Sequence, residues 1–375
     1  MDKQAGMRIA QICHRYVPSI GGIEFYVQRL IKDSLKRGVE MEVLTTDLGT
    51  PLAGRRKEAH YFKTLFSFMG NPFSFGLLRH LQSNSYDLLH VHNIWFVPGL
   101  LAVFFRKNAK VVTTLHGVYP VRASFWRTFF LNLYKPLARY VLAKSHKIIV
   151  ADSSTDRLTK MFKINPEKIV VIPNGIELSP YRPAKKDPVV LFTGRILPDK
   201  NPEILIKAAE ILTRTIADFR LVFLGPMKEN YRKKLVRLVK ERGLEGQTAF
   251  AGTLNPCYPR EKEKLMSIYK KAYVYVLLSY WEGLPTRLLE AMQFEVPCIA
   301  YASGGIPQLI RDHDNGLILD RLDEHLLAER LLVLFQSRAL AKRLGQRARL
   351  TVKNHYHWPK LSKKILAVYD TLGRR

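Results

Sequence analysis

The sequence predicts an α/β fold made of two doubly wound, Rossmann-like domains that face each other across a cleft. Short β-type runs alternate with helical patterns, which is typical of βαβ units and a parallel sheet. The alternation restarts after SPYRPAKKDP, a segment rich in proline and lysine that predicts a linker. The chain has 375 residues, more than one hydrophobic core usually fills. In such sheets, ligands bind beyond the carboxyl ends of the strands.

The first half of the chain, residues 1–182, is predicted to be one domain. It begins as a strand, a glycine-rich loop and an amphipathic helix, in MRIAQICHRYVPSIGGIEFYVQRLIKDSLKRG. Gly38 predicts the end of that helix, because glycine takes the left-handed conformation that often follows a last helical turn. Further strands are predicted from the runs VEMEVLTT, YDLLHVHN, AKVVTTLHG, HKIIVADSS and EKIVVIPNG.

The pattern of strands and helices repeats in residues 183–352, which we predict to be the second domain. Its strands are expected in DPVVLFTGRI, DFRLVFLGP, AYVYVLLS and VPCIAYASGG. Helices are expected at residues 203–213 and 231–242, between these strands. Residues 353–375 predict one more helix at the end of the chain.

Composition narrows the class of protein. The net charge is +28, and residues 59–151 contain eleven basic residues against one acidic residue, Asp87, among many aromatic ones. Such a segment suits an anionic membrane, an acidic substrate or nucleic acid, although it could serve solubility alone.

Three distant cysteines without a CxxC pair favour a reducing compartment. The longest apolar run, residues 94–105, is shorter than the roughly 20 residues of a membrane span. Together with the absence of a recognisable signal peptide, this predicts a cytoplasmic protein.

The stretch EGLPTRLLE places two glutamates around the expected start of a helix. Pro285 suits a first helical turn, and a helix N-terminus favours a phosphate group. Glu282 precedes the helix and Glu290 lies about a turn and a half inside it. Carboxylates accept paired hydrogen bonds from sugar hydroxyls, so two of them beside an anion site predict a nucleotide sugar. The alternative is that Glu290 is an ordinary surface residue of the helix.

Three other segments add candidates. FTGRILPDKN carries Arg195 and Lys200, two cations that could neutralise a diphosphate, or that could lie on a solvated loop. SIGGIE carries Gly21 and Gly22, which permit close approach of the backbone to an anion. TLHG places His116 at the end of a predicted strand, where a histidine could also be purely structural.

Together, SIGGIE, TLHG, VIPNGIE, TGRILPDKN, EGLPTRLLEAM and SGGIPQLI resemble motifs of the retaining glycosyltransferases of family 4, which have the GT-B fold. The resemblance covers nearly the whole chain and is more specific in the second half. It implies that the last helix returns to the first domain. It also implies a donor site, with Glu290 on the ribose, Glu282 on the sugar and two cations on the diphosphate. The implied donor-binding residues are Gly21, Gly22, Arg195, Lys200, Glu282, Gly283, Leu284, Thr286 and Glu290. The implied catalytic residues are His116, Arg195, Lys200 and Glu282.

Some positions depart from the family pattern or suggest a metal. Glu295 follows the EGLPTRLLEAM helix where the family often has glycine, so that helix must end without one. Glu177 and Gln308 replace an aspartate and a glutamate of the family. Residues 312–314, Asp-His-Asp, match a DxD metal motif, yet their position resembles a family turn. His90 and His92 lack an evident third ligand. We therefore expect neither a metal ion nor a cofactor.

These features predict a hexosyltransferase that moves a sugar from a UDP- or GDP-sugar and retains its anomeric configuration. The basic, aromatic segment favours a membrane-associated or lipid-linked acceptor in glycan, glycolipid or cell-surface polysaccharide synthesis, with the enzyme peripheral on the cytoplasmic face of an anionic membrane. The alternative is the same chemistry on a soluble acceptor, either a sugar phosphate or a glucan. Nucleic-acid binding is a remote alternative, because no helix-turn-helix or RRM motif is present.

Overall fold

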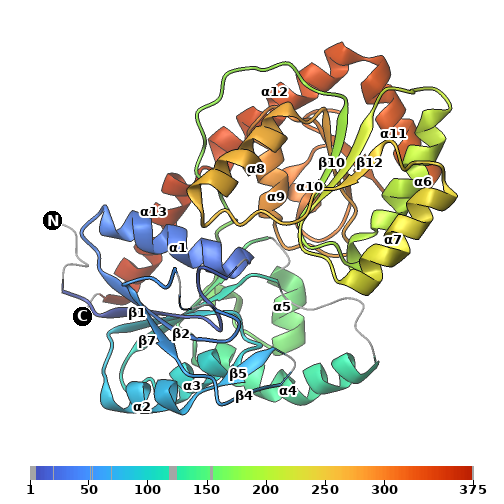
Figure 1. The fold of residues 1–375 in the computed structure, drawn as a ribbon. Helices are drawn as coiled ribbons and strands as arrows, with labels where there is room; N and C mark the ends of the chain where they lie inside the picture. The colour runs from blue at the N-terminus through green and yellow to red at the C-terminus, as the bar shows by residue number, and fades with distance from the viewer. Residues whose placement is uncertain are drawn as a thin grey trace. The chain divides into compact units, whose positions relative to one another are not determined.

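The computed structural model describes residues 6–19, 21–50, 52, 54–68, 70–117, 125–152 and 155–373. The chain divides into two compact units. Unit 1 comprises Met1–Asn174 and Pro359–Arg375, and unit 2 comprises Gly175–Trp358 (Figure 1). The division thus falls eight residues before the Arg182 boundary drawn from the sequence, and six residues after residue 352. Each unit has a Rossmann-like arrangement, a parallel sheet with helices packed on it, so the predicted fold class is confirmed.

Unit 1 contains a parallel sheet in the order β3-β2-β1-β6-β7-β8-β9. The order reverses between β1 and β6, and this reversal is the topological switch point at which doubly wound sheets bind ligands. The strands are β1 (Ile9–Ile12), β2 (Met41–Thr46), β3 (Ala59–Phe62), β6 (Leu88–His92), β7 (Lys110–Leu115), β8 (Lys147–Val150) and β9 (Ile169–Val171).

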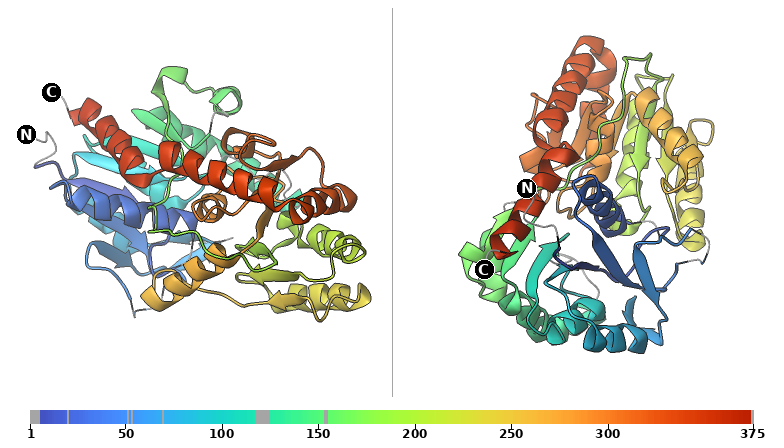
Figure 2. Two further views of the ribbon diagram at one scale, coloured as in Figure 1. Left: turned by 90° about the horizontal axis from the view of Figure 1, so that it is seen from above. Right: turned by 90° about the vertical axis from the view of Figure 1, so that its left-hand side faces the viewer.

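Helices cover both faces of this sheet (Figures 1 and 2). Ala10 and Ile12 of β1 belong to the apolar core beneath α2 (Phe75–Ser83), α3 (Val97–Phe104), α4 (Phe125–Lys144) and α5 (Thr155–Phe162). Because strand side chains alternate between faces, Gln11 points to the opposite side. There α13 (Trp358–Gly373) contacts the sheet through Tyr369, which bonds Gln11, and it bonds α1 (Gly22–Leu35) through Ser362 and Asp33.

A small antiparallel hairpin interrupts the alternation in unit 1. It consists of β4 (Phe66–Phe68) and β5 (Asn71–Phe73) and lies outside the seven-stranded sheet. The rings of Phe66 and Phe73 stack across it with centroids 5.3 Å apart. Phe68 contacts Phe130 of α4 edge to face at 5.1 Å, so the hairpin and α4 share an aromatic surface.

Unit 2 contains a second parallel sheet, in the order β12-β11-β10-β13-β14-β15, with its reversal between β10 and β13. Its strands are β10 (Val189–Thr193), β11 (Arg220–Leu224), β12 (Thr248–Phe250), β13 (Val274–Leu277), β14 (Cys298–Tyr301) and β15 (Leu317–Leu319). Its helices are α6 (Pro202–Thr213), α7 (Glu229–Glu241), α8 (Pro259–Lys271), α9 (Thr286–Met292), α10 (Ile306–Leu309), α11 (Glu324–Gln336) and α12 (Arg338–His355).

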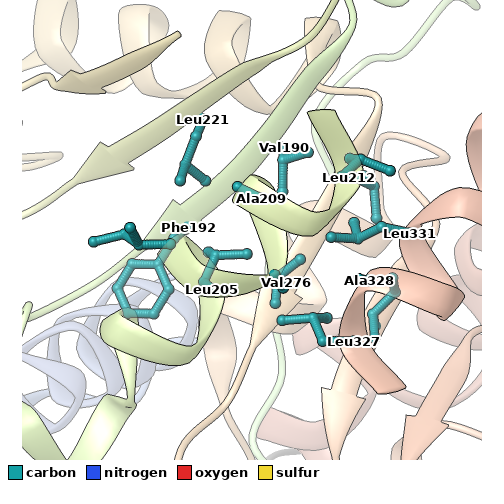
Figure 3. Close-up of a cluster of buried hydrophobic side chains, with 14 of the residues drawn as sticks. Val190, Phe192, Leu205, Ala209, Leu212, Leu221, Val276, Leu327, Ala328 and Leu331 are labelled. Carbon is teal, nitrogen blue, oxygen red and sulfur yellow. The ribbon is translucent and has the colours of Figure 1, made fainter. Parts of the chain in front are cut away.

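The core of unit 2 lies between this sheet and helices α6 and α11 (Figure 3). Leu205 and Leu212 of α6 and Leu331 of α11 are buried over Val190 and Val276 of the central strands. Central strands that are buried on both faces read as continuous apolar runs, as VVLFT does in β10. This core fixes the ends of β10 and β13, from which the candidate site residues project.

Candidate functional site

The candidate residues of unit 2 follow the two central strands at the switch point. Arg195 lies two residues after β10, and Lys200 ends the short 3₁₀ turn Pro198–Lys200 that follows. Glu282 lies five residues after β13. Because parallel strands end at the same edge of a sheet, this topology brings segments distant in sequence together.

Lys200 and Glu282 form an ion pair with the Nζ and Oε1 atoms 2.6 Å apart. Ser279 donates a second hydrogen bond to the same Oε1, at 2.7 Å. The side chains of Lys200 and Glu282 are only 15% and 23% exposed. Within the described residues, Oε2 of Glu282 carries no hydrogen bond. One carboxylate oxygen is therefore held by the protein while the other can accept a bond from a ligand.

The backbone of Glu282 is fixed by the turn that follows β14. Gly305 N–H donates to the carbonyl oxygens of Glu282, at 3.1 Å, and Gly283, at 2.9 Å. Gly304 has φ +54°, and a Cβ at this position would stand 1.7 Å from the carbonyl oxygen of Glu282. Only glycine fits here, for both its conformation and its space. This turn, Ser303-Gly304-Gly305 (the SGG turn), therefore supports Glu282.

Glu290 is buried in α9 and is 8% exposed, so its interpretation as a surface residue is wrong. Its Oε2 accepts hydrogen bonds from Arg287 at 2.8 Å and from Tyr269 at 3.1 Å. Tyr269 in turn lies 2.7 Å from the hydroxyl of Thr193, the last residue of β10. Burial, and then the charge of Glu290, raise the pKa of the Tyr269 hydroxyl. The carboxylate is thus oriented from both its own helix and α8.

Arg287 and Tyr269 did not emerge from the sequence. Arg287 could have been found, because residues three apart on a helix share a face and the pair has the charges of an ion pair. Tyr269 lies 21 residues before Glu290 on another helix, and no local pattern signals that contact.

The start of α9 differs slightly from the sequence-based prediction. Pro285 is the N-cap, in an extended conformation, and the helix begins at Thr286. The carbonyl of Pro285 accepts bonds from the N–H groups of Leu288 and Leu289. Within the described residues, the N–H groups of Thr286 and Arg287 have no acceptor. Gly283, Leu284 and Thr286 therefore lie in one turn between the two glutamates.

Arg195 contrasts with Lys200. Its side chain is exposed, and in the described part of the chain it forms no ion pair or hydrogen bond. An unpaired guanidinium keeps its planar fork available for an anion.

In unit 1, Gly21 and Gly22 begin α1 immediately after the first loop. Gly21 is the N-cap, and the carboxylate of Glu24 folds back over it, so a Cβ there would meet Oε2 of Glu24 at 2.1 Å. A Cβ on Gly22 would meet nothing within 4 Å among the protein atoms. An alanine at position 21 would therefore have to displace the Glu24 carboxylate, whereas one at position 22 would meet open space.

His116 follows β7 and is partly buried. Its Nε2 lies 3.1 Å from Nδ1 of His92, and its ring meets Tyr26 edge to face at 4.7 Å. Burial, together with the charge of the nearby His14, lowers the pKa of His116 to about 3. At neutral pH His116 is therefore an uncharged imidazole.

Two residues that follow β1, His14 and Arg15, each carry a buried side-chain nitrogen without a hydrogen-bond partner. His14 stacks on Phe96 with centroids 3.7 Å apart, and its buried Nδ1 has no hydrogen bond. The Nε of Arg15 is likewise buried without a partner, and within the described residues Arg15 forms no ion pair. A half-buried guanidinium without a counter-charge costs free energy unless a ligand supplies one. Neither residue lies in a recognisable motif of the sequence.

The Asp-His-Asp segment forms the turn before β15. Asp314 accepts bonds from Arg311 and Arg347, which hold the pKa of its carboxyl below the usual value. Asp312 accepts from the N–H of Ile318. His90 and His92 are buried and hydrogen-bonded to side chains. Over the ranges that the structure covers, no three His, Cys, Asp or Glu residues are grouped so as to hold a metal ion. Over the same ranges, no helix has the length and apolarity that a membrane span requires.

The chain matches two protein-family models in tandem. The model "Glycosyltransferase Family 4" matches residues 20–180, and the model "Glycosyl transferases group 1" matches residues 177–351. D-inositol 3-phosphate glycosyltransferase of Nocardia farcinica is 24% identical over 93% of this chain and 84% of its own. N-acetyl-alpha-D-glucosaminyl L-malate synthase of Bacillus anthracis is 24% identical over 98% of this chain and 96% of its own.

Among solved structures, HepE of Anabaena in complex with UDP-glucose superposes with a TM-score of 0.79 at 16% identity, over 97% of this chain and all of that one. Two family models in sequence, two Rossmann-like units and a fold of this similarity agree with one another. The chain belongs to the family 4 glycosyltransferases of the GT-B fold.

Proposed function

We propose that the protein transfers a hexosyl residue from a nucleoside-diphosphate sugar to a soluble acceptor that carries an anionic group. The observation that carries the donor part is the pair of partly or fully buried carboxylates, Glu282 and Glu290, beside Lys200 at the switch point of unit 2. A structural neighbour with UDP-glucose bound supports the nucleotide sugar.

Each donor residue has a role that follows from its contacts. Glu290, oriented by Arg287 and Tyr269, would accept bonds from the ribose hydroxyls. Glu282 would receive a sugar hydroxyl on Oε2, because Oε1 is occupied by Lys200 and Ser279. Arg195 and Lys200 would bind the diphosphate, together with the N–H groups of Thr286 and Arg287.

The reaction would proceed by cleavage of the bond between the anomeric carbon and the phosphate oxygen. The nucleoside diphosphate leaves with the electron pair, and Arg195 and Lys200 stabilise its growing charge without a metal ion. The acceptor hydroxyl attacks from the same face, and its proton passes to the departing phosphate. Anomeric configuration is retained. Neutral His116 would accept a hydrogen bond from a sugar hydroxyl.

Arg15 supports an anionic acceptor. It is a half-buried cation without a counter-charge in the described residues, next to His14 and, through His14, near His116. Two relatives carry names that refer to D-inositol 3-phosphate and L-malate, small molecules with a phosphate or a carboxylate. These names favour the soluble acceptor over the lipid-linked one that the sequence first suggested, and Arg15 favours a sugar phosphate over a glucan.

A lipid-borne acceptor is the second candidate, and one observation favours it. Large apolar side chains are exposed on the hairpin, α2, α3 and α4 of unit 1, namely Leu65, Phe66, Phe68, Phe75, Phe104, Phe129, Leu133 and Leu137. These elements contain no acidic residue, and α4 adds the exposed cations Arg139 and Lys144. Such a surface suits an anionic bilayer.

A thermal-shift screen with UDP-, GDP-, ADP- and dTDP-sugars tests the donor site, because a ligand that binds the native state raises its melting temperature. We expect one nucleotide class to stabilise the wild type. Arg195→Gln and Glu290→Gln should lose most of this shift, whereas the exposed controls Arg260→Gln and Glu263→Gln in α8 should keep it. A full shift in both site variants would contradict the proposal.

The acceptor and the stereochemistry need separate measurements. Arg15→Gln should raise the KM for a phosphorylated acceptor at least tenfold, with a smaller effect on the same acceptor without phosphate.

NMR of the first-formed product should show the donor's anomeric configuration, and inversion would refute the mechanism. Sedimentation with phosphatidylglycerol vesicles distinguishes the second candidate: salt-sensitive binding lost in Phe68→Ser/Leu133→Ser would favour a lipid-borne acceptor.

A further inference from the structure

A chain of buried hydrogen bonds links the C-terminal helix of unit 1 to His116. Tyr369 of α13 lies 2.5 Å from Nδ1 of His90 and accepts from Nε2 of Gln11 at 3.2 Å. The Oε1 of Gln11 lies 2.8 Å from Nε2 of His92, and His92 Nδ1 lies 3.1 Å from His116 Nε2. At the other end, Nε2 of His90 lies 2.6 Å from the hydroxyl of Thr114. These buried side chains on three strands and α13 thus form one connected path.

The sheet register creates this path. Gln11 of β1 is the direct neighbour of His90 in β6, and His92 is the neighbour of Thr114 in β7. Because strand side chains alternate, these four residues share the face that α1 and α13 cover. Gln11, His90 and Tyr369 are fully buried, and His92 is 1% exposed. The bonds among these four side chains are therefore shielded from bulk water.

Two orders of the protons along the path are compatible with the positions of the heavy atoms. In one order every hydrogen bond runs in the opposite direction to the other. In the first order, His116 donates from Nε2 to His92, and His92 donates from Nε2 to Gln11. Gln11 then donates to Tyr369, which donates to His90, and His90 donates to Thr114. The second order reverses every bond and requires the Gln11 amide to turn over, so that its oxygen would face Tyr369.

Met41 selects between the two orders. Its sulfur lies 3.2 Å from the amide nitrogen of Gln11, where an N–H group can donate to the weakly accepting thioether. The reversed amide would place its oxygen against that sulfur, and neither atom could donate. All three histidines are neutral at pH 7, since burial lowers each pKa far below 6.5. The proton order is therefore fixed by neutral groups alone.

We infer that Gln11, His92 and Tyr369 are positioning residues that hold His116 as the Nε2–H tautomer. Its Nδ1 then bears a lone pair and has no hydrogen-bond partner among the described residues. His116 can thus accept a hydrogen bond from a hydroxyl group but cannot donate one from that nitrogen. This inference rests on the proposed function only where it assigns that hydroxyl to a sugar.

The tautomer can be measured without any activity. In full-length protein labelled with ¹⁵N-histidine, long-range ¹H–¹⁵N correlation separates protonated from bare ring nitrogens, and His116→Asn assigns the signals of His116. We expect wild-type His116 to carry its proton on Nε2. Gln11→Met, which removes the acceptor for His92, should give a mixture of both tautomers at His116. A proton on Nδ1 in the wild type, or an unchanged spectrum in Gln11→Met, overturns the inference.

Kinetics then test whether the path matters for turnover. With UDP-glucose, or whichever nucleotide sugar gives the largest thermal shift, Gln11→Met should lower kcat about tenfold and leave the donor KM within about twofold. If Gln11→Met does not fold, Tyr369→Phe replaces it. The matched control is Tyr86→Phe, which removes a tyrosine hydroxyl 2.8 Å from His80, a histidine outside the path. Mixed tautomers with unchanged kcat would refute the positioning role. An inactive wild type with the expected tautomer would refute the proposed function alone.

Discussion

At the scale of the residue, Gly304 is the position where one added methyl group has the largest expected effect on the donor site. Its Cβ would collide with the carbonyl oxygen of Glu282, and φ +54° is unfavourable for alanine. We expect Gly304→Ala to lower the free energy of unfolding by about 2 kcal/mol or more, and to displace Glu282. Urea denaturation and the donor-induced thermal shift measure these two effects.

The control for that substitution is Gly246→Ala. Gly246 has open space around it and no positive φ, so alanine there should leave both measurements nearly unchanged. If Gly304→Ala behaved like Gly246→Ala, the SGG turn could not be the support of Glu282.

Residues also differ in how far the sequence predicts them. The ends of EGLPTRLLE and the cations of TGRILPDKN could be proposed because local spacing and charge point to an anion between two carboxylates. Tyr269, Arg15 and Tyr369 could not, because their significance depends on burial and on partners far along the chain. The two histidines of HVH were noticed, but alternation alone does not reveal that a tyrosine 279 residues after His90 completes their bonding.

At the scale of the element, the end of α9 shows how this chain departs from a glycine-ended helix. Glu295 takes φ +55°, the left-handed conformation that glycine adopts more easily. The carboxylate also interacts with Tyr181, so removing it has its own effect. Comparing two variants isolates the backbone term: we expect Glu295→Gly to be more stable than Glu295→Ala by about 1 kcal/mol.

Chemical denaturation of the two Glu295 variants provides the measurement, provided that their free energies of unfolding fall with denaturant concentration at the same slope. Both lack the carboxylate, so the difference between them reports the left-handed backbone. An alanine variant as stable as the glycine variant would mean that residue 295 is not held at positive φ in solution.

Elements were predictable where their pattern was strong. The central strands and α6 and α7 are recovered because apolar runs and helical periodicity recur over several turns or a whole strand. The three-residue strands β12 and β15 and the β4–β5 hairpin were not predicted, because three residues are too few to show the alternation of a strand. Their pairing is decided by the neighbouring strand or by aromatic contacts between elements.

At the scale of the whole molecule, unit 1 should be the acid-sensitive unit. Burial is the first cause that lowers the pKa of His14, His90 and His116 to about 3, and that of His92 well below 6.5. Below pH 6.5 the unfolded chain binds protons that the native state excludes. The stability contributed by these neutral histidines is therefore complete above pH 6.5 and falls as pH drops toward 3. Each one costs about 1.4 kcal/mol per pH unit in that window.

Hydrogen exchange resolved by peptide can locate this loss, once rates are corrected for the intrinsic pH dependence of exchange. Between pH 7.5 and 5.5 we expect the slowest amides of β1, β6 and β7 to lose protection, while those of β10 and β13 change far less. Because the four histidines lie in unit 1, equal losses in both units would contradict the assignment. So would a loss that appears only as pH rises, since that sign requires groups whose pKa is raised on folding.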